Sequence, residues 1–478
     1  MQNLLMNSFL LLILSFKLSS MVSKTFKNKI EERQFLIDLC RQFNTSGKEL
    51  WLVGGAVRDF LLDIETNDYD FATDATTEEI LEILSEGNYR STEVGRAFGT
   101  IAAHREENTF HITSYRKDEY ITDSRKPRTT VATSLLVDLS RRDFTINAIA
   151  YDPLSGNMED PFKGIKDLGS GELNTPMDST VTFSEDPLRM LRACRFISKY
   201  QFSINQDMFK SIQKESSRIE IVSVERIRDE LSKMLFGTKP SLGLRVFVES
   251  GLSNYIIPEI NDLKIESDPD HQHKDVYEHT MVVTDTVSQT LPLRLAALLH
   301  DIAKPRTKGI DGDKVHFRHH EVVGGKMAKE IMERLRYDKA LIKKTKRLVE
   351  LHLRPHTFKM GWTDSAVRRY IVDADEELEE LNELVRADVT TKNENKKKEI
   401  YGYLDELESR IAEVVENEEV RKMRPPITGN DVMRELDLTP GPTVGKIMKE
   451  LYEQRINEGL VSVEEALELA KKIKEKSS

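Results

Sequence analysis

Two carboxylates one residue apart follow a double-glycine turn in residues 51–74, WLVGGAVRDFLLDIETNDYDFATD. The glycines are Gly54 and Gly55, and the carboxylates are Asp68 and Asp70. A glycine turn that leads into a helix offers bare backbone N–H groups to phosphate. Carboxylates at i and i+2 on a strand point to the same side, so both can reach one pair of divalent ions. The stretch therefore predicts nucleotidyl transfer, and the alternative is a plain turn with a solvated carboxylate pair.

The elements around this stretch predict a small mixed sheet flanked by helices. Residues 28–44 have apolar positions at helical spacing and predict a helix before the glycine turn. A second helix begins at the capping pattern of residues 76–79 and runs to Gly87. Three short β-rich segments follow at 89–94, 98–103 and 109–114. We expect Asp68 and Asp70 to lie on a strand of the same sheet.

A pair of arginines in the compact motif RRDFTINAIA, residues 141–150, is the next candidate for phosphate chemistry. Arg141 or Arg142 beside the carboxylates would neutralise a triphosphate. Because the two are adjacent, at most one faces the site if the segment is helical. The alternative is a structural salt bridge to Asp143.

Residues 184–200, SEDPLRMLRACRFISKY, predict a helix capped by Ser184, with Asp186 and Arg189 on one face. A carboxylate accepts a hydrogen bond from an exocyclic amino group, and a guanidinium donates to a ring nitrogen. Cytosine and adenine offer that pair of groups, whereas guanine and uracil offer a carbonyl and an N–H. The pair therefore predicts selection of C and A without a template. Arg192 and Arg195 continue the face, and the alternative is an ion pair within the helix.

Histidines gather in the second half of the chain, where nine of eleven lie between His271 and His356. Imidazoles and carboxylates on facing helices build metal sites. The sequence does not decide between His319 and His320 as a ligand, and it leaves His352 open. The other candidate ligands are His279, His300, Asp301 and Asp388.

These motifs together resemble a known family. The order G-G-x-V-R-D … D-x-D over residues 54–70 resembles the DNA polymerase β-type nucleotidyltransferases, in the form found in the tRNA nucleotidyltransferase and bacterial poly(A) polymerase family. Residues 141–148 and 185–189 are similar to its R-R-D-F-T-x-N-A and E-D-x-x-R motifs. Residues 123–127, D-S-R-K-P, are similar to the flexible loop of members that switch from adding C to adding A. The histidine series resembles the HD superfamily of metal-dependent phosphohydrolases.

The resemblance covers about residues 35–470 and implies a class II CCA-adding tRNA nucleotidyltransferase with an HD domain, of the actinobacterial type. It implies an α+β, mostly helical fold, with a polymerase-β-type palm followed by an all-α neck and body and an all-α HD domain. The expected parts are a catalytic domain at 28–165, a nucleotide-selecting and tRNA-binding neck and body at 166–262, an HD domain at 263–410 and a helical tail at 411–478.

The implied reaction joins CTP and ATP to the 3′ end of tRNA. Asp68 and Asp70 would hold two Mg²⁺ ions, and an unspecified divalent metal would occupy the HD domain. Gly54, Gly55 and Arg58 would hold the triphosphate. Asp186 and Arg189 would choose the base, with Arg192 and Arg195 supporting them or touching phosphate.

Three alternatives within the family are a poly(A) polymerase, a CC-adding enzyme and an A-adding enzyme. The loop at 116–131 disfavours the CC-adding enzyme, whose relatives tend to lack it. The alternative from another class is an HD phosphohydrolase that acts on RNA ends or nucleotides, with an N-terminal domain that only binds RNA.

Composition restricts the setting of this chemistry. Charged residues make up 32% of the 478, and the net charge is −11, so a polyanion must be bound by a local basic patch. Cys40 and Cys194 lie far apart in apolar surroundings. They predict buried thiols in a reducing compartment, the cytoplasm, and no disulfide.

The first 20 residues contain the apolar run 9–14 but no charged segment before it and no A-x-A-like cleavage site. The run is too short and too interrupted to span a bilayer well. We interpret residues 1–20 as an over-extended start or a disordered leader, expect no membrane association, and keep an export signal as the alternative.

Overall fold

The structure is a computed structural model, and it describes residues 26–93, 99–119, 128–132, 134–264, 275–312, 314–391, 393–418, 425–458 and 462–477. The predicted leader at 1–20 and the D-S-R-K-P segment at 123–127 lie outside these residues. The chain divides into two compact units, Met1–Asn261 and Asp262–Ser478. Each unit is described below by itself.

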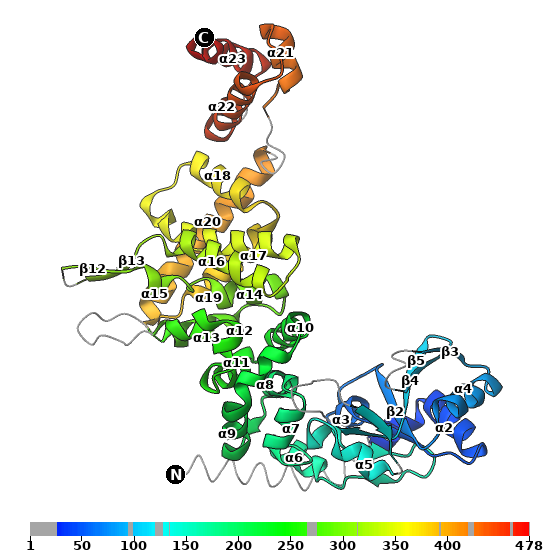
Figure 1. The fold of residues 1–478 in the computed structure, drawn as a ribbon. Coiled ribbons are helices and arrows are strands. Elements are labelled where there is room, and N and C mark those ends of the chain that lie inside the picture. The colour runs from blue at the N-terminus through cyan, green and yellow to red at the C-terminus, as the bar shows by residue number, and fades with distance from the viewer. Residues whose placement is uncertain are drawn as a thin grey trace. The chain divides into compact units, whose positions relative to one another are not determined.

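The first unit contains a seven-stranded mixed sheet with the strand order β3-β4-β5-β2-β1-β8-β9 (Figure 1). Strands β2 and β5 are parallel, and all the other neighbours are antiparallel. The strands are β1 (Leu50–Val53), β2 (Tyr69–Thr73), β3 (Arg90–Glu93), β4 (Thr100–Arg105), β5 (Asn108–Ser114), β8 (Ala150–Tyr151) and β9 (Met158–Glu159).

The helices of the sheet region are α2 (Gln34–Thr45), α3 (Gly55–Leu61), α4 (Thr77–Glu86) and α5 (Leu135–Ser140). Helix α4 begins at the predicted cap, where Thr76 and Glu79 form a reciprocal capping box. The helix predicted for residues 28–44 is interrupted, because residues 26–31 are helical, residues 32 and 33 are not, and α2 begins at Gln34. There the Lys29 carbonyl accepts from the side chain of Arg33 at 2.9 Å, in place of a helical backbone bond.

The loop expected at 116–131 begins and ends as a hairpin. Strand β6 (Arg116–Glu119) pairs antiparallel with β7 (Arg128–Val131). Only residues 120–127 between them lie outside the described part of the chain. The predicted loop is therefore shorter than its polar composition suggested.

The single helix predicted for residues 184–200 is two helices, α7 (Ser179–Glu185) and α8 (Leu188–Tyr200). Ser184 lies inside α7 and is not a cap, and Asp186 is extended with φ −129° and ψ 95°. Pro187 explains the break, because a proline disfavours helical geometry in the residue before it. Asp186 therefore precedes α8 and does not lie on its face, so the i, i+3 helical argument for the Asp186 and Arg189 pair was wrong.

The rest of the first unit is mainly helical. This region also contains the two-residue strands β10 (Glu172–Leu173) and β11 (Ser203–Ile204), which pair in parallel. Its helices are α6 (Gly164–Ser170), α9 (Gln206–Glu215), α10 (Val224–Leu235), α11 (Pro240–Glu249) and α12 (Ser253–Ile256), with 3₁₀ turns η2 (Thr145–Asn147), η3 (Ser216–Ile221) and η4 (Pro258–Leu263).

The second unit is built of helices and contains one hairpin, β12 (Lys308–Asp311) with β13 (Lys314–Phe317), that the all-α prediction did not include. Its last three helices share a separate apolar core around Val432, Ile447 and Ala466. The helices are α13 (Val276–Thr286), α14 (Leu291–Leu299), α15 (Lys304–Thr307), α16 (His320–Arg334), α17 (Lys339–Leu351), α18 (Asp364–Ala374), α19 (Leu378–Asp388), α20 (Glu394–Glu418), α21 (Gly429–Leu436), α22 (Pro442–Glu458) and α23 (Val463–Ser477), with 3₁₀ turns η5 (Arg354–Met360) and η6 (Asp375–Glu377).

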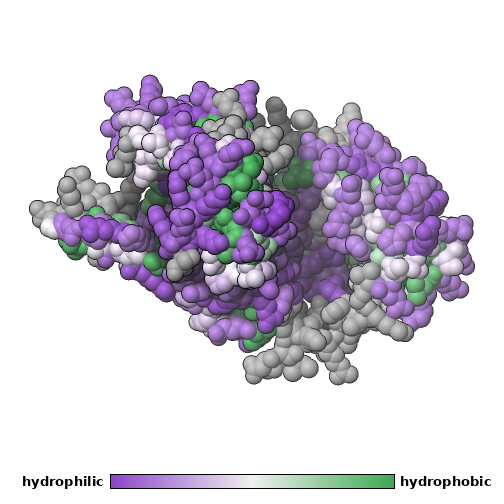
Figure 2. Space-filling model, turned by 90° about the horizontal axis from the view of Figure 1, so that it is seen from above, coloured by the Kyte–Doolittle hydropathy of each residue, from purple (hydrophilic) through white to green (hydrophobic). Residues whose placement is uncertain are grey.

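The fold class is confirmed as mostly helical with a small mixed sheet. The face shown in Figure 2 is largely hydrophilic, with apolar residues confined to limited patches. Among the described helices, none is both long enough and apolar enough to cross a membrane. Both cysteines are buried and unpaired, as predicted.

Helix α8 is tied to the sheet region by one buried carboxylate, Asp143. Its Oδ2 accepts from Arg192 Nε on α8 at 2.7 Å, and its Oδ1 accepts from Asn147 Nδ2 at 2.9 Å. Asn147 in turn accepts a hydrogen bond from Arg58 on α3. Burial raises the pKa of Asp143, but the charges of Arg192 and Arg189 and the hydrogen bonds from Asn147 and Arg192 together outweigh it and hold that pKa well below its usual range. The carboxylate is therefore ionised and joins α3, η2 and α8.

We predict that Asp143→Ala costs about 3–5 kcal/mol in the free energy of unfolding, because it leaves the half-buried Arg192 guanidinium without its carboxylate. Urea unfolding followed by Trp51 fluorescence, in a Trp362→Phe background, measures this loss for the first unit. The matched control is Asp38→Ala, whose carboxylate pairs with Arg41 at the surface and should cost less than about 1 kcal/mol. Equal losses in the two variants would contradict the role given to Asp143.

Candidate active site and metal centre

Asp68 and Asp70 lie at the start of strand β2. Asp70 belongs to the strand, whereas Asp68 immediately precedes it, so only one of the two is on a strand as expected. Their carboxylates share a group with the ring of His111 on β5, in which one ligand atom from each residue lies within 4.8 Å of the others. Two carboxylates and an imidazole at this spacing fit a divalent metal site.

The electrostatics of Asp70 also fit cation binding. Partial burial raises the pKa of Asp70, and the charge of Asp68 raises it further, while Arg142 and His111 lower it. Two adjacent carboxylates repel each other when both are ionised. A divalent cation between them removes that repulsion.

Gly54 brings the backbone turn against this carboxylate pair. It has φ +71°, and a Cβ at this position would lie 2.9 Å from Arg142 Nη1 and 3.9 Å from Asp70 Oδ2. Glycine is required here both by the left-handed backbone and by the close approach of the arginine. The turn, Arg142 and Asp70 therefore form one cluster.

Arg141 and Arg142 both bond the buried carboxylate of Asp138 on α5. Arg141 Nη2 donates to Asp138 Oδ1 at 2.6 Å, and Arg142 Nη2 donates to Asp138 Oδ2 at 3.1 Å. The alternative of a salt bridge to Asp143 is wrong, because Arg192 occupies that carboxylate. Arg142 places its Nη1 beside Gly54, and its Nε is buried without a hydrogen-bond partner among the described residues.

Arg58 is buried, whereas a side chain that binds phosphate has to be accessible to it. It is 7% exposed, donates to Asp59 Oδ1 at 2.9 Å and to Asn147, and stacks over the rings of Phe196 and Tyr200. These contacts hold α3 against α8. The structure thus gives Arg58 a positioning role, and its contact with triphosphate stays a prediction.

Asp186 and Arg189 lie at the beginning of α8. Asp186 Oδ1 accepts from the backbone of Leu188 at 3.2 Å, and the backbone N–H of Arg189 donates to the Asp186 carbonyl at 3.0 Å. Arg189 is buried, and its Nη2 donates to the carbonyl of Arg141. Arg189 is thereby held at the segment that also carries Arg142, whereas the Asp186 carboxylate lies 4.0 Å from Arg226 of α10.

Arg192 and Arg195 have carboxylate partners within the first unit. Arg192 bonds Asp143, and Arg195 Nη1 donates to Glu230 on α10 at 3.1 Å. Of the two roles expected from the sequence, these contacts favour support of the α8 face over contact with phosphate.

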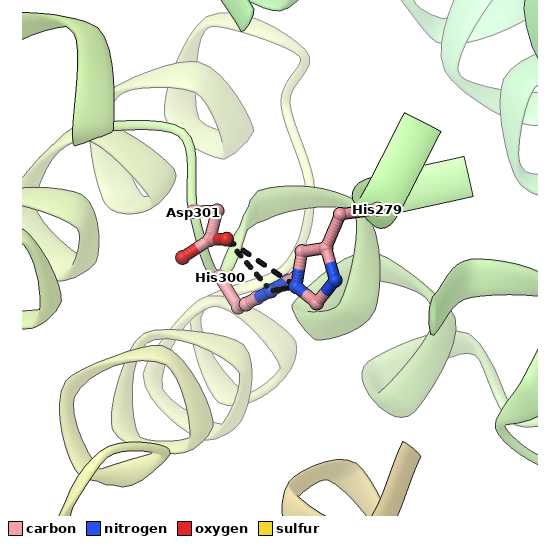
Figure 3. Close-up of side chains that lie close together, drawn as sticks. All are labelled: His279, His300 and Asp301. Atoms are coloured by element: carbon pink, nitrogen blue, oxygen red, sulfur yellow. Dashed lines mark hydrogen bonds and ion pairs between the residues drawn. The ribbon is translucent and has the colours of Figure 1, made fainter. Parts of the chain in front are cut away.

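A second centre lies in the second unit, where His279 from α13 meets His300 and Asp301 at the end of α14 (Figure 3). The Nε2 atoms of the two histidines are 3.1 Å apart, and Asp301 Oδ2 lies 3.4 Å and 3.2 Å from them. All three residues are buried. Three ligand atoms that converge in this way are typical of a bound metal ion.

Asp301 also belongs to a second buried group, with His320 of α16 and His352 at the end of α17. Its Oδ1 lies 3.3 Å from His320 Nε2 and 3.9 Å from His352 Nε2. Within the described part of the chain, all three atoms are buried without a hydrogen-bond partner. A buried polar atom left unsatisfied is costly, so these atoms fit a shared cation.

The histidine rings are oriented for ligation. The Nδ1 atoms of His300, His320 and His352 bond the carbonyls of Ala297, Phe317 and Val349 at 2.7–2.8 Å. His279 Nδ1 bonds Thr390 Oγ1 at 2.8 Å. A carbonyl accepts only an N–H, which leaves Nε2 with its lone pair toward the centre, as in metal sites. His319 is exposed and lies outside both groups, so the geometry selects His320 of the adjacent pair.

Asp388 at the end of α19 completes the centre. Its Oδ1 lies 2.8 Å from His279 Nε2, and its Oδ2 lies 3.3 Å from His356 Nε2. Burial lowers the pKa of His352 to about 3, which keeps it neutral. Burial raises the pKa of Asp301, but the charges of His300 and Lys304 and the polar contacts with the rings of His300 and His320 together outweigh it and hold that pKa well below its usual range. Ionised carboxylates and a neutral imidazole are the ligand forms that a metal requires.

Three family profiles match the chain in order. The Poly A polymerase head domain matches residues 50–174, the family described as "Probable RNA and SrmB- binding site of polymerase A" matches 201–264, and the HD domain matches 276–393. An A-adding tRNA nucleotidyltransferase of Deinococcus radiodurans is 30% identical over 421 residues, which cover 84% of this chain and 91% of that enzyme.

The chain belongs to the tRNA nucleotidyltransferase/poly(A) polymerase family.

Other members of the family are similar over a shorter stretch. A CCA-adding enzyme of Geobacillus thermodenitrificans is 38% identical over 224 residues, which cover 47% of this chain and 54% of that enzyme. The chain thus spans about half the length of this curated relative. The family resemblance inferred from the motifs is confirmed, and the actinobacterial type stays a prediction.

The fold agrees with solved structures of the family. The structure of a Bacillus stearothermophilus CCA-adding enzyme in complex with CTP has a TM-score of 0.67 and 21% sequence identity, and it covers 92% of this chain and 97% of that one. This likeness extends across both units. The nucleotidyltransferase and HD domains together imply the use of divalent metal.

Sequence reasoning missed His111 and His356 and left His352 open. The alternation of Phe110 and Ile112 with polar residues places His111 on the solvated face of its strand, but the pairing of β5 with β2 is not visible in the sequence. His356 and His352 were part of the histidine cluster, yet four-residue spacing does not show which ring faces the centre.

We predict that a divalent metal, tested as Mn²⁺ and Zn²⁺, raises the midpoint of thermal unfolding of the second unit. The ion satisfies the unpaired atoms of Asp301, His320 and His352 and binds only the folded state. His320→Ala should remove most of this stabilisation, and the neighbouring His319→Ala should keep it. Calorimetry with chelator and with added metal measures the unfolding midpoint of both variants. If His319→Ala alone lost the stabilisation by metal, the choice of His320 over His319 as the ligand would be wrong.

Proposed function

We propose that this protein adds CCA to the 3′ end of tRNA, without a template, from CTP and ATP. The observation that carries the proposal is the buried network around Asp143, which holds the carboxylate cluster and helix α8 in one arrangement. A catalytic centre and a base-selecting segment fixed to each other are what template-independent, base-specific transfer requires.

In this proposal Asp68 and Asp70 hold two Mg²⁺ ions. Ions at that position lower the pKa of the attacking 3′-hydroxyl and neutralise the leaving pyrophosphate. The backbone at Gly54 and Gly55 approaches the phosphates, and Arg142, which lies against Gly54, donates to them. The attacking oxygen of the tRNA adds to the α-phosphorus as the bond to pyrophosphate breaks.

Asp186 and Arg189 select the incoming base. Arg189 is anchored by the Arg141 carbonyl, which leaves part of its guanidinium fork to donate to N3 of cytosine or N1 of adenine. Asp186 accepts from the exocyclic amino group. The network that positions Arg192 and Arg58 keeps this segment at a fixed distance from the carboxylates.

An A-adding enzyme is the second candidate. It is favoured by one observation, namely that the relative matched over 91% of its length is named an A-adding tRNA nucleotidyltransferase. The two candidates differ in the first nucleotides added, so the state of the tRNA end separates them.

The second centre is proposed to be a metal-dependent phosphohydrolase site. A cavity of about 350 Å³ adjoins it and includes His279, Asp388, Lys304 and Lys396 in its lining. Two ammonium groups beside a metal centre suit a phosphoester of RNA ends or nucleotides, for example a 2′,3′-cyclic phosphate.

We further propose the division into a catalytic domain at 28–165, a neck and body at 166–262, an HD domain at 263–410 and a tail at 411–478. The buried free thiols of Cys40 and Cys194 support a cytoplasmic location, where thiols stay reduced.

Nucleotide incorporation tests the proposed activity. The protein is incubated with tRNA lacking its 3′ end, or with tRNA ending in CC, together with labelled CTP, ATP and Mg²⁺. We expect ordered addition of C, C and A to the first tRNA and of A to the second. Addition to the second alone would support the A-adding enzyme, and no addition to either would overturn both.

Separate variants assign the two centres. Asp70→Ala should lower incorporation at least about a thousandfold, since it removes a metal ligand, and should leave hydrolysis of a cyclic phosphate unchanged. His300→Ala should show the reverse pattern. If Asp70→Ala retained incorporation, the role given to the carboxylate pair would be wrong.

Base selection is tested by Asp186→Ala. We expect the preference for ATP over GTP to fall at least about tenfold, because the site loses its acceptor for the amino group. The control is Asp207→Ala at an exposed position of α9, which should keep the preference. Single-turnover rates with each nucleotide give the ratio, and an unchanged ratio in Asp186→Ala would contradict the assignment.

A further inference from the structure

We propose that His111 is a metal ligand beside Asp68 and Asp70, and that it shifts the preference of this site from Mg²⁺ toward the first-row transition metals Mn²⁺ and Co²⁺. The inference rests on the proposed nucleotidyl transfer and adds a residue and a metal preference to it. Mg²⁺ still supports the reaction, but His111 gives the other two ions an advantage that a site made only of oxygen ligands would lack.

The backbone fixes the position of His111. Strands β2 and β5 are parallel, and Asp70 is the direct partner of His111 in their register. Paired residues of neighbouring strands point to the same face of a sheet, so the imidazole and the Asp70 carboxylate share a face, and they lie 3.8 Å apart. On its other side His111 pairs with Ala102 of β4, which offers no side-chain polar atom that could compete for the ring.

The distances fit shared ligation better than a hydrogen bond. His111 Nδ1 lies 3.6 Å from Asp68 Oδ1 and 3.8 Å from Asp70 Oδ1. Both separations exceed the usual donor–acceptor range. Ligands about 2.1 Å from one ion are about 3.0 Å apart when adjacent and about 4.2 Å apart when opposite, which brackets both values.

The ring is also free of any other anchor. Among the residues that the structure describes, His111 makes no hydrogen bond, and its side chain is 37% exposed. His104 on the neighbouring strand contrasts with it, because its ring nitrogens bond Thr92 at 3.2 Å and Thr109 at 3.1 Å. His104 is held by its strand neighbours, whereas His111 faces only the two carboxylates.

The donor set determines the metal preference. Mg²⁺ binds oxygen ligands and keeps several waters, and an imidazole nitrogen adds little to its affinity. Affinity for sites with nitrogen ligands rises from Mn²⁺ to Co²⁺ along the first-row series. The advantage from His111 should therefore be larger for Co²⁺ than for Mn²⁺.

Metal activation of nucleotide incorporation tests the proposal in the full chain. The half-activating concentrations of Mg²⁺, Mn²⁺ and Co²⁺ are measured for the wild type, for His111→Glu and for the control His104→Gln. His111→Glu keeps a ligand but replaces nitrogen by oxygen. We expect it to lower the preference for Mn²⁺ over Mg²⁺ about tenfold, and that for Co²⁺ more, while His104→Gln keeps both ratios. Unchanged ratios in His111→Glu would overturn the proposal.

Pulsed electron paramagnetic resonance of bound Mn²⁺ gives a readout that does not depend on activity. In an Asp301→Ala background, which removes the ligand common to both groups of the second centre, a ¹⁴N coupling to Mn²⁺ should be present and should disappear in His111→Gln. Persistence of the coupling in His111→Gln would overturn the proposal. If no metal supports incorporation, the proposed function fails, and the spectrum still decides whether His111 is a ligand.

Discussion

The carboxylate of Asp143 lies buried between the sheet region and helix α8, where it accepts hydrogen bonds from Arg192 and Asn147. A buried charge is stable only with hydrogen-bonding or charged partners, so the sheet region and helix α8 must each supply one. Asn147 also accepts a hydrogen bond from Arg58 of α3, and α3 follows the Gly54 turn beside the carboxylate pair. The distance from the proposed phosphate site to the proposed base selector is therefore set by the pairing of buried charges as well as by apolar packing.

The second centre places a similar constraint on the other unit. Five buried residues on or next to α13, α14, α16 and α17, together with the half-buried Asp388 of α19, bring their ligand atoms together, and three of these atoms have no hydrogen-bond partner among the described residues. Apolar packing alone gives no reason for such a polar core, because each unpaired buried acceptor is costly. A cation supplies the missing partner. The helix ends are thus positioned by ligand geometry, and the peptide carbonyls that accept from Nδ1 keep each ring in that orientation.

Features that depend only on residues near each other in the sequence could be predicted from it. The Gly54 turn, the capping box of Thr76 and Glu79, and the HD dyad were all found in this way. The break between α7 and α8 is also local, since Pro187 forces Asp186 out of helical geometry, but the apolar spacing of the segment concealed it. Contacts between distant segments were not predictable. The pairing of Asp143 with Arg192 and the register of His111 with Asp70 depend on tertiary packing, which one sequence does not encode in a readable pattern.

The base selector combines two kinds of constraint. Arg189 is on α8, is buried, and donates to the backbone carbonyl of Arg141, the residue next to Arg142, which lies against Gly54. Asp186 precedes the helix, in an extended residue between two helix ends, and its carboxylate caps the backbone of Leu188. In the proposed function, a donor held by tertiary contacts and an acceptor held by a local turn would present the same pattern to cytosine and to adenine, whose rings differ in size but not in that edge. Discrimination against guanine and uracil would then come from the hydrogen-bond pattern of the base edge. The space for the larger adenine ring would have to come from elements other than the segment that carries Asp186 and Arg189.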